Sequence, residues 1–205
     1  MNADLTSDPR RRLLHVGCGH PQGSVLPACF TRESWQEIRM DIDPRVKPDV
    51  IGSITDLSAV GDAGVDAVYS SHNLEHVNSF EVPQALSEFR RVLKDDGFAL
   101  ITLPDLRAVA RRIADDLLTE PLYQSAAGPI SPLDILFGHQ AAIAAGNEYM
   151  AHRTGFTARS LGHALIDAGF AEVRVHEGRR WELWAVGTMP QTPDEVFEQL
   201  ACVLT

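Results

Sequence analysis

"LLHVGCGHPQG", residues Leu13 to Gly23, begins with an apolar run of strand length that stops at Gly17 and Gly19. Glycine at the end of a parallel strand lets the backbone turn tightly, and it lets a ligand approach where a Cβ would collide. The stretch therefore indicates a ligand site at the end of the first strand. A Gly-x-Gly pair does not by itself identify the ligand. It also leaves open why His15 lies just before the first glycine.

A second signal lies at the end of the next strand, where Asp41 stands in "RMDIDP". In a doubly wound sheet the first two strands are neighbours, and a carboxylate at this place accepts hydrogen bonds from the hydroxyls of a ribose. Asp43, which precedes Pro44, is explained equally well by an Asx-type turn. The pair of signals predicts a nucleoside site in which Asp41 holds the ribose.

The nicotinamide-binding fingerprint has a third glycine three residues after the second. Gln22 occupies that position here and Pro21 precedes it, and the chain has no Tyr-x-x-x-Lys pair. A nicotinamide-dependent oxidoreductase on the same kind of sheet is therefore disfavoured, although it stays an alternative.

Strand-like and helix-like periods alternate along the chain, which is typical of an α/β domain. Several strand candidates are apolar at nearly every position, as strands covered on both faces should be. The last two are joined across Gly178 and Arg179 like a hairpin. We predict a Rossmann-like, doubly wound, mostly parallel seven-stranded sheet with one antiparallel strand near the C-terminus. The candidates are "RLLHV", "EIRMDI", "DVIGSI", "VDAVYSS", "FALITLP", "AEVRVHE" and "RWELWAVG".

Apolar residues recur at helical spacing from Val82 to Leu93, which predicts a crossover helix. A second helix is predicted after Thr157, with Thr157 as N-cap and Gly169 as its end. Between these elements, "SPLD" at Ser131 predicts a capped helix that ends near Gly146.

We expect a single domain over residues 1–205, with a core at about 12–188. Residues from about 123 to 154 do not fit the alternation and form a helical insertion after the fifth strand. Such insertions commonly cover the ligand crevice, so we expect a lid. A tail helix is predicted at about 193–204.

Charge and cysteine usage narrow the class of partner. The chain has 18 Lys+Arg against 28 Asp+Glu, a net charge of -10, and 44% hydrophobic residues. This acidic balance disfavours nucleic acid and anionic membranes as partners. The three cysteines, Cys18, Cys29 and Cys202, form no C-x-x-C pair. Because neither a membrane-spanning run nor a signal-peptide core is present, we expect a cytoplasmic location.

The series "LLHVGCGH", "IRMDIDP", "DVIGSITDL", "VDAVYSSHNLEHV", "EFRRVLKDDGFALITLP" and "AGFAEVRV" resembles the class I S-adenosylmethionine-dependent methyltransferases, most closely the type 11 group. The match runs in order from about residue 12 to 176. It implies a transferase that uses S-adenosylmethionine to methylate an acceptor by in-line displacement. We expect a small-molecule acceptor with a hydroxyl or amine. A non-catalytic cofactor-binding subunit is a further alternative, and a homodimer stays open.

The resemblance also implies a set of cofactor contacts. Gly17 and Gly19 pass beneath the methionine part, Asp41 binds the ribose hydroxyls, and Ile42 lies against the adenine face. Ser53 stands where relatives often have an acid, and the backbone of Ile54 is left to meet the ring. The implied cofactor-binding residues are Gly17, Cys18, Gly19, Asp41, Ile42, Ser53, Ile54, Ser70, Ser71 and His72.

Histidines supply the candidate catalytic bases. His72 in "SSHNLEHV" and His152 in "YMAHRTGF" are candidates if the acceptor is a hydroxyl. For His72, cofactor contact is an equal alternative, and for His152 an ordering hydrogen bond in the lid is the simpler explanation. His15 replaces an acid that many relatives use toward the methionine ammonium, and a histidine satisfied beneath the sheet is at least as good an account. The carboxylates and histidines show no dense ligand spacing, so the sequence demands no metal.

Overall fold

A computed structural model describes residues 8–21, 26–125 and 127–204. Its central sheet has seven strands in the order β3-β2-β1-β4-β5-β9-β8. β1, β2, β3, β4 and β5 are parallel, while β9 is antiparallel to both of its neighbours. The predicted mostly parallel sheet with one antiparallel strand is confirmed. The strands are β1 (Arg11–Val16), β2 (Trp35–Asp41), β3 (Val50–Ile51), β4 (Val65–Ser71), β5 (Leu93–Pro104), β8 (Glu172–Glu177) and β9 (Glu182–Thr188).

Two strands, β3 and β5, differ most in length from the prediction. β3 is paired only at Val50 and Ile51, because the chain turns away once Gly52 has donated its amide hydrogen bond to the Asp41 carbonyl. β5 starts earlier than expected, at Leu93, and its pairing with β4 shifts register between Val65 and Ala67. The central strands are the most deeply buried, in keeping with their uninterrupted apolar pattern.

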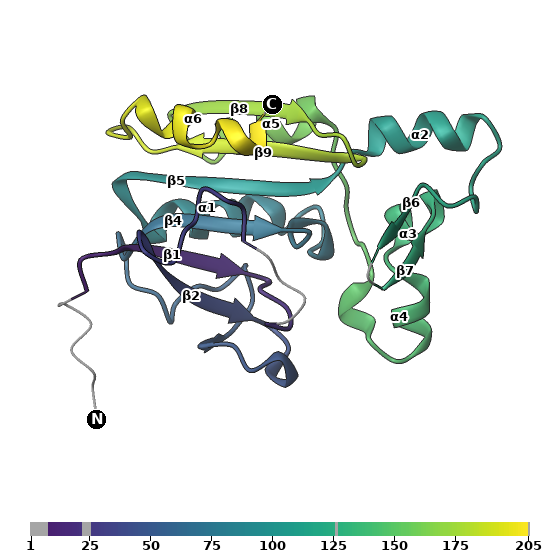
Figure 1. The fold of residues 1–205 in the computed structure, drawn as a ribbon, viewed down its shortest axis with the longest axis horizontal. Helices are drawn as coiled ribbons and strands as arrows, with labels where there is room; N and C mark the ends of the chain where they lie inside the picture. The colour runs from purple at the N-terminus through teal and green to yellow at the C-terminus, as the bar shows by residue number, and fades with distance from the viewer. Residues whose placement is uncertain (1–7, 22–25, 126, 205) are drawn as a thin grey trace.

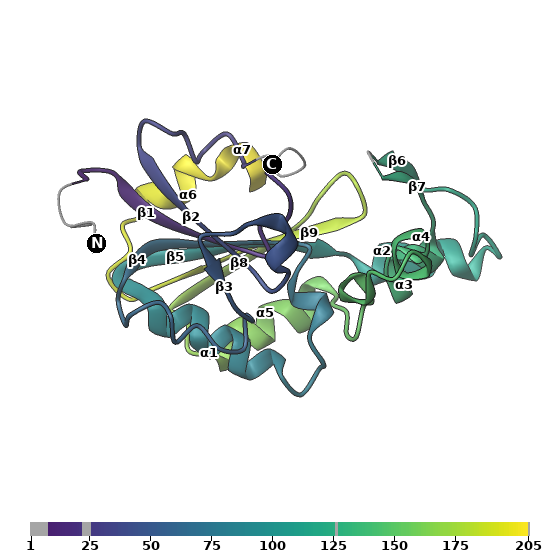
Figure 2. The ribbon, with the colours of Figure 1, turned by 90° about the horizontal axis from the view of Figure 1, so that it is seen from below.

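One face of the sheet is covered by α1 (Val82–Val92) and α5 (Ala158–Asp167), which lie together below the strands in Figure 2. α1 buries its apolar stripe in the main core. α5 begins with a capping box in which the Thr157 and Ser160 side chains each accept a hydrogen bond from the other residue's amide. It is followed by Gly169 at φ +91°, as its sequence predicts.

The opposite face is covered by the segment before β2 and by the C-terminal helices (Figure 2). The C-terminal tail was predicted as one helix but forms two, α6 (Glu195–Gln199) and α7 (Ala201–Leu204). The helix is interrupted at Leu200, whose side chain is buried in the core. Phe30 packs edge-on against Trp35 and stacked on Phe98. Within the described ranges, no helix has the length and apolar character needed to cross a bilayer.

The chain between β5 and α5 stands beyond the carboxyl ends of the parallel strands, whose arrowheads point toward it in Figure 1. Its elements are α2 (Leu106–Ala114), a hairpin of β6 (Tyr123–Ser125) and β7 (Gly128–Ile130), α3 (Pro132–Phe137), α4 (Gln140–Ala144) and the 3-10 turn η3 (Glu148–Met150). The sequence pattern did not predict the hairpin, and the prediction of one helix from Ser131 to near Gly146 was wrong. The helix ends at Gly138, at φ +92°, because Gly138 pairs there with Ala151.

Candidate functional site

A cleft of about 380 Å³ opens at the carboxyl ends of β1, β2 and β4. It is bordered on one side by the turns that follow these strands and on the other by η3. Seven of the residues predicted as cofactor contacts line it, together with residues that the sequence did not single out. The predicted residues that line it are Gly17, Gly19, Asp41, Ile42, Ser53, Ile54 and His72; the others include Asn73, His76, Tyr149 and Arg153.

The two glycines after β1 both have left-handed backbones, at φ +63° for Gly17 and φ +59° for Gly19. They differ in what a side chain would meet. Among the described residues, a Cβ on Gly17 would collide with Asn73, while a Cβ on Gly19 would meet nothing within 4 Å. Gly17 is thus required by packing, whereas Gly19 leaves space inside the cleft. A ligand that needs close approach to the backbone fits there.

Asp41 is the last residue of β2, and its carboxylate links the turn after β1 to the turn after β2. Its Oδ2 accepts a hydrogen bond from the Gly19 amide at 2.8 Å, and its Oδ1 accepts one from the Asp43 amide at 2.9 Å. Each carboxylate oxygen has a further lone pair for a ligand hydroxyl. Ile42, 47% exposed, offers an apolar surface next to it. Beyond the next strand, Ser53 bonds Thr55 at 2.8 Å between hydroxyl oxygens.

Three predicted contacts do not line the cleft. Cys18 points into the protein, and burial raises the pKa of its thiol to about 11. Ser70 on β4 is fully buried, and its hydroxyl oxygen has no hydrogen-bond partner within the described part of the chain. Ser71, the last residue of β4, is half-buried. The direction of each of these side chains depends on the alternation along the strand and on the direction of the turn. A strand that is apolar at nearly every position does not show in its sequence which side chains face the cleft.

His15 is a buried partner of the neighbouring strand rather than a cleft residue. Its Nδ1 lies 2.7 Å from Oε1 of Glu37 on β2, and its ring packs at 5.0 Å on Tyr69. The hydrogen bond with His15 lowers the pKa of Glu37. The histidine before the glycines is therefore satisfied beneath the sheet.

His72 follows β4 with a left-handed backbone at φ +47°, and its ring is half-exposed at the cleft. Its Nδ1 lies 3.5 Å from Oε1 of Glu75, whose side chain is only 1% exposed. Burial alone would lower the pKa of His72, but the nearby Glu75 carboxylate outweighs it and the net shift is upward. Burial likewise works to raise the pKa of Glu75, yet His72 and the nearby histidines hold it below its usual range.

His152 lies behind the cleft wall, at the end of the insertion. Its Nδ1 is 2.7 Å from the Ile135 carbonyl, and its ring meets that of His76 edge-on at 4.8 Å. Burial lowers the pKa of His152. The sequence pattern did not indicate a role in the site for His76 or Glu75. Both stand in "SSHNLEHV" beside His72, but the burial of Glu75 and the nearness of His152 are not local properties of that segment.

Comparison with known proteins gives one family match. Residues 14–101 match the model of a family described as a methyltransferase domain. The matched segment runs from β1 to β5 and contains the glycines, Asp41 and His72. No curated protein matches the chain.

Solved structures share the fold across most of the chain. A SAM-dependent methyltransferase from Archaeoglobus fulgidus is 18% identical with a TM-score of 0.55, covering 88% of this chain and 86% of its own. The 1,6-didemethyltoxoflavin-N1-methyltransferase of Burkholderia thailandensis, solved with 1,6-didemethyltoxoflavin and S-adenosylhomocysteine, is 15% identical with a TM-score of 0.53. That match covers 90% of this chain and 72% of the other.

Proposed function

We propose that this chain, a class I S-adenosylmethionine-dependent methyltransferase, transfers the methyl group to a small-molecule acceptor through a hydroxyl or amine. The observation that carries the proposal is one continuous cleft. It is lined both by the residues suited to the cofactor and by His72, Tyr149 and Arg153, where we place the acceptor. Its volume of about 380 Å³ lies in the range of small-molecule sites. The net charge of -10 argues against a nucleic-acid acceptor.

The residues at the strand ends are suited to hold the cofactor. Asp41 would bind the ribose hydroxyls, Ile42 and Ile54 would enclose the adenine, and the open space at Gly19 would take the methionine part. The sulfonium of S-adenosylmethionine supplies an activated methyl group and keeps the electron pair of the broken carbon–sulfur bond. The protein then needs chiefly to align the acceptor and to take up its proton.

His72 is the base that we assign to a hydroxyl acceptor. Glu75 lies against Nδ1 of the ring, so Nδ1 carries the hydrogen and Nε2 has the lone pair. A base oriented in this way by a buried carboxylate is the arrangement used to activate weak nucleophiles. The acceptor proton moves to Nε2 of His72 as the oxygen bonds the methyl carbon.

The insertion would act as a lid over the acceptor. Glu148, Tyr149 and Met150 of η3 line the cleft, and Phe137 and Tyr149 are large apolar side chains with more than half of their surface exposed. Closure over a bound acceptor would bury such surface and exclude water.

Calorimetry separates this proposal from its alternatives. Binding of S-adenosylmethionine or S-adenosylhomocysteine without binding of NAD is expected, and NAD binding alone would support the oxidoreductase instead. A panel of small hydroxyl and amine compounds is then screened for the release of S-adenosylhomocysteine. Cofactor binding without turnover of any acceptor class would favour the non-catalytic subunit.

His72→Gln tests the role of the base. General-base catalysis contributes roughly 10²- to 10⁴-fold, so kcat should fall by that range while the affinity for S-adenosylhomocysteine stays unchanged. His163→Ala, an exposed histidine on α5, serves as the control. A loss of cofactor affinity with kcat preserved would make His72 a cofactor contact rather than a base.

A further inference from the structure

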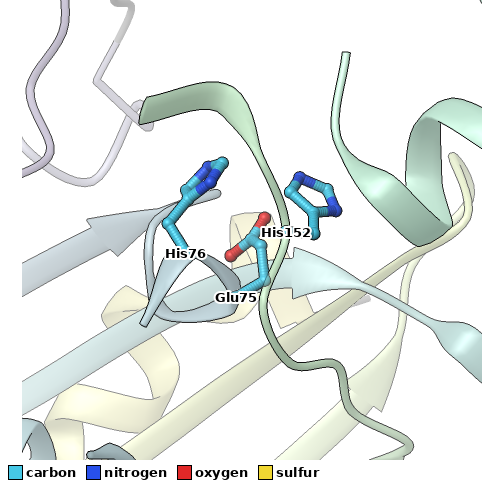
Figure 3. Close-up of side chains that lie close together, drawn as sticks. All are labelled: Glu75, His76 and His152. Carbon is cyan, nitrogen blue, oxygen red and sulfur yellow. The ribbon is translucent and has the colours of Figure 1, made fainter. Parts of the chain in front are cut away.

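Three potential metal ligands from distant parts of the chain meet beside the cleft. Glu75 and His76 belong to the 3-10 turn η2 (Leu74–His76), and His152 follows η3. One ligand atom from each of the three side chains lies within 4.8 Å of the others. In Figure 3 the Glu75 carboxylate lies between the two imidazole rings.

Both histidines are held through the same ring nitrogen. Nδ1 of His76 lies 3.0 Å from the Ala151 carbonyl, and Nδ1 of His152 lies 2.7 Å from the Ile135 carbonyl. A carbonyl oxygen only accepts hydrogen bonds, so Nδ1 carries the hydrogen in each ring and Nε2 of the neutral ring has the free lone pair. Metal-binding histidines are oriented in this manner by a carbonyl on the second nitrogen.

Glu75 supplies an independent observation. Its side chain is 1% exposed, and among the residues that the structure describes neither carboxylate oxygen has a hydrogen-bond partner. The nearest group that can carry a positive charge is the His72 imidazole, whose Nδ1 lies 3.5 Å from Oε1, and it is uncharged when it acts as a base. A carboxylate so deeply buried is costly unless it is paired with charge or coordinates a metal. A cation bound beside the Glu75 carboxylate would therefore stabilise its buried charge.

We propose that Glu75, His76 and His152 bind one divalent transition-metal ion of the zinc type. Two imidazoles and one carboxylate form a ligand set that leaves a coordination position open, as in catalytic zinc sites. Magnesium and calcium prefer oxygen ligands, so the two imidazoles argue against them. Ligand atoms about 2.1 Å from zinc lie about 3.4 Å apart in tetrahedral geometry, so the side chains must draw in slightly from their present spread.

Backbone hydrogen bonds hold the segments that carry Glu75 and His152 together. The Glu75 carbonyl accepts hydrogen bonds from the amides of Arg153 at 2.8 Å and Thr154 at 3.1 Å. These bonds fasten the end of the insertion to η2, so the position of His152 relative to Glu75 does not depend on a free loop.

The role of the ion rests on the proposed function. His76 lines the cleft, so the open position would face the acceptor end. An acceptor hydroxyl bound there would lose its proton more readily, and its oxygen would be fixed in place for transfer. The proton still goes to His72, and no oxidation or reduction is involved.

Metal binding is tested separately from methyl transfer. Chelator-treated protein is titrated calorimetrically with ZnCl₂, and the visible absorption of a Co²⁺ complex reports the ligand geometry. We expect one ion per chain. Because changes in groups that merely orient metal ligands cost about 10- to 100-fold in affinity, His152→Ala and the isosteric Glu75→Gln should each weaken zinc binding at least tenfold. His163→Ala should bind zinc like the parent.

Absence of stoichiometric binding, or equal zinc affinity in the parent and in His152→Ala, would overturn the site. Circular dichroism and binding of S-adenosylhomocysteine by the same variants show whether they are folded, and Glu75→Gln preserves side-chain shape if His152→Ala does not fold. Zinc binding without turnover of any acceptor would contradict the proposed function but not the metal site.

Discussion

The amide of Gly19 donates a 2.8 Å hydrogen bond to the carboxylate of Asp41, so the turn after β1 is tied directly to the end of β2. Both residues line the same cleft. The carboxylate thus has two tasks. It orders the glycine turn through this hydrogen bond, and we propose that its remaining lone pairs accept hydrogen bonds from a ribose.

Asp41→Ala should weaken binding of S-adenosylhomocysteine and leave the fold intact. Two hydrogen bonds to a charged acceptor suggest a loss on the order of 2 to 4 kcal/mol of binding free energy. Calorimetry measures it. Asp43→Ala removes a neighbouring carboxylate that pairs with Arg45 instead, and it should bind the ligand like the parent. Parental affinity in Asp41→Ala would show that Asp41 does not hold the ribose.

Gly19→Ala should abolish or severely weaken cofactor binding, because its methyl group would occupy the open space that we assign to the methionine part. Gly128→Ala is the matched control. Gly128 also has positive φ, and among the described residues nothing lies within 4 Å of the place that its Cβ would take, but it lies in the β6–β7 hairpin. Alanine in the left-handed backbone of Gly19, at φ +59°, costs roughly 1 to 2 kcal/mol, and Gly128→Ala, at φ +123°, should lose at least as much stability. If both bound the ligand alike, the cleft end at Gly19 would not be the cofactor site.

Cys18 should resist alkylation in the native protein. Thiolate is the reactive form, and with a pKa of about 11 only about 0.1% of the thiol is ionised at pH 8. Exposed Cys202 should therefore be labelled by iodoacetamide much sooner, as followed by mass spectrometry of the two peptides. Labelling of Cys18 should accelerate as the pH rises toward 11, and urea should remove the difference between the sites. Equal native rates at pH 8 would contradict the buried position.

The insertion should become protected from hydrogen exchange when S-adenosylhomocysteine and an acceptor bind together. The effect should centre on α4 and η3, since η3 lines the cleft and Tyr149 is 51% exposed. The amides of Arg153 and Thr154 should be protected already, because they bond the Glu75 carbonyl. Strong, ligand-independent protection throughout residues 139–150 would identify a rigid insertion.

Much of the fold follows from patterns that act locally. β4 is predicted to the residue, because an apolar run flanked by turn residues can be satisfied only in a strand covered on both faces. The capping boxes at Ser131 and Thr157 involve residues three positions apart, so they are visible in the sequence. The break at Gly138 was not visible, because its cause is the distant Ala151.

The site divides in the same way. Glycines and a carboxylate at strand ends are ordered by the sheet itself, so the sequence alone determined that Gly17, Gly19 and Asp41 border one cleft. Only the tertiary structure decided that Glu75 is buried without hydrogen bonds and that His152 reaches it from the end of the insertion. Periodicity reports which face of an element is apolar. It carries no information about which polar groups from remote segments are brought within bonding distance, because that depends on how the insertion packs against the turn after β4.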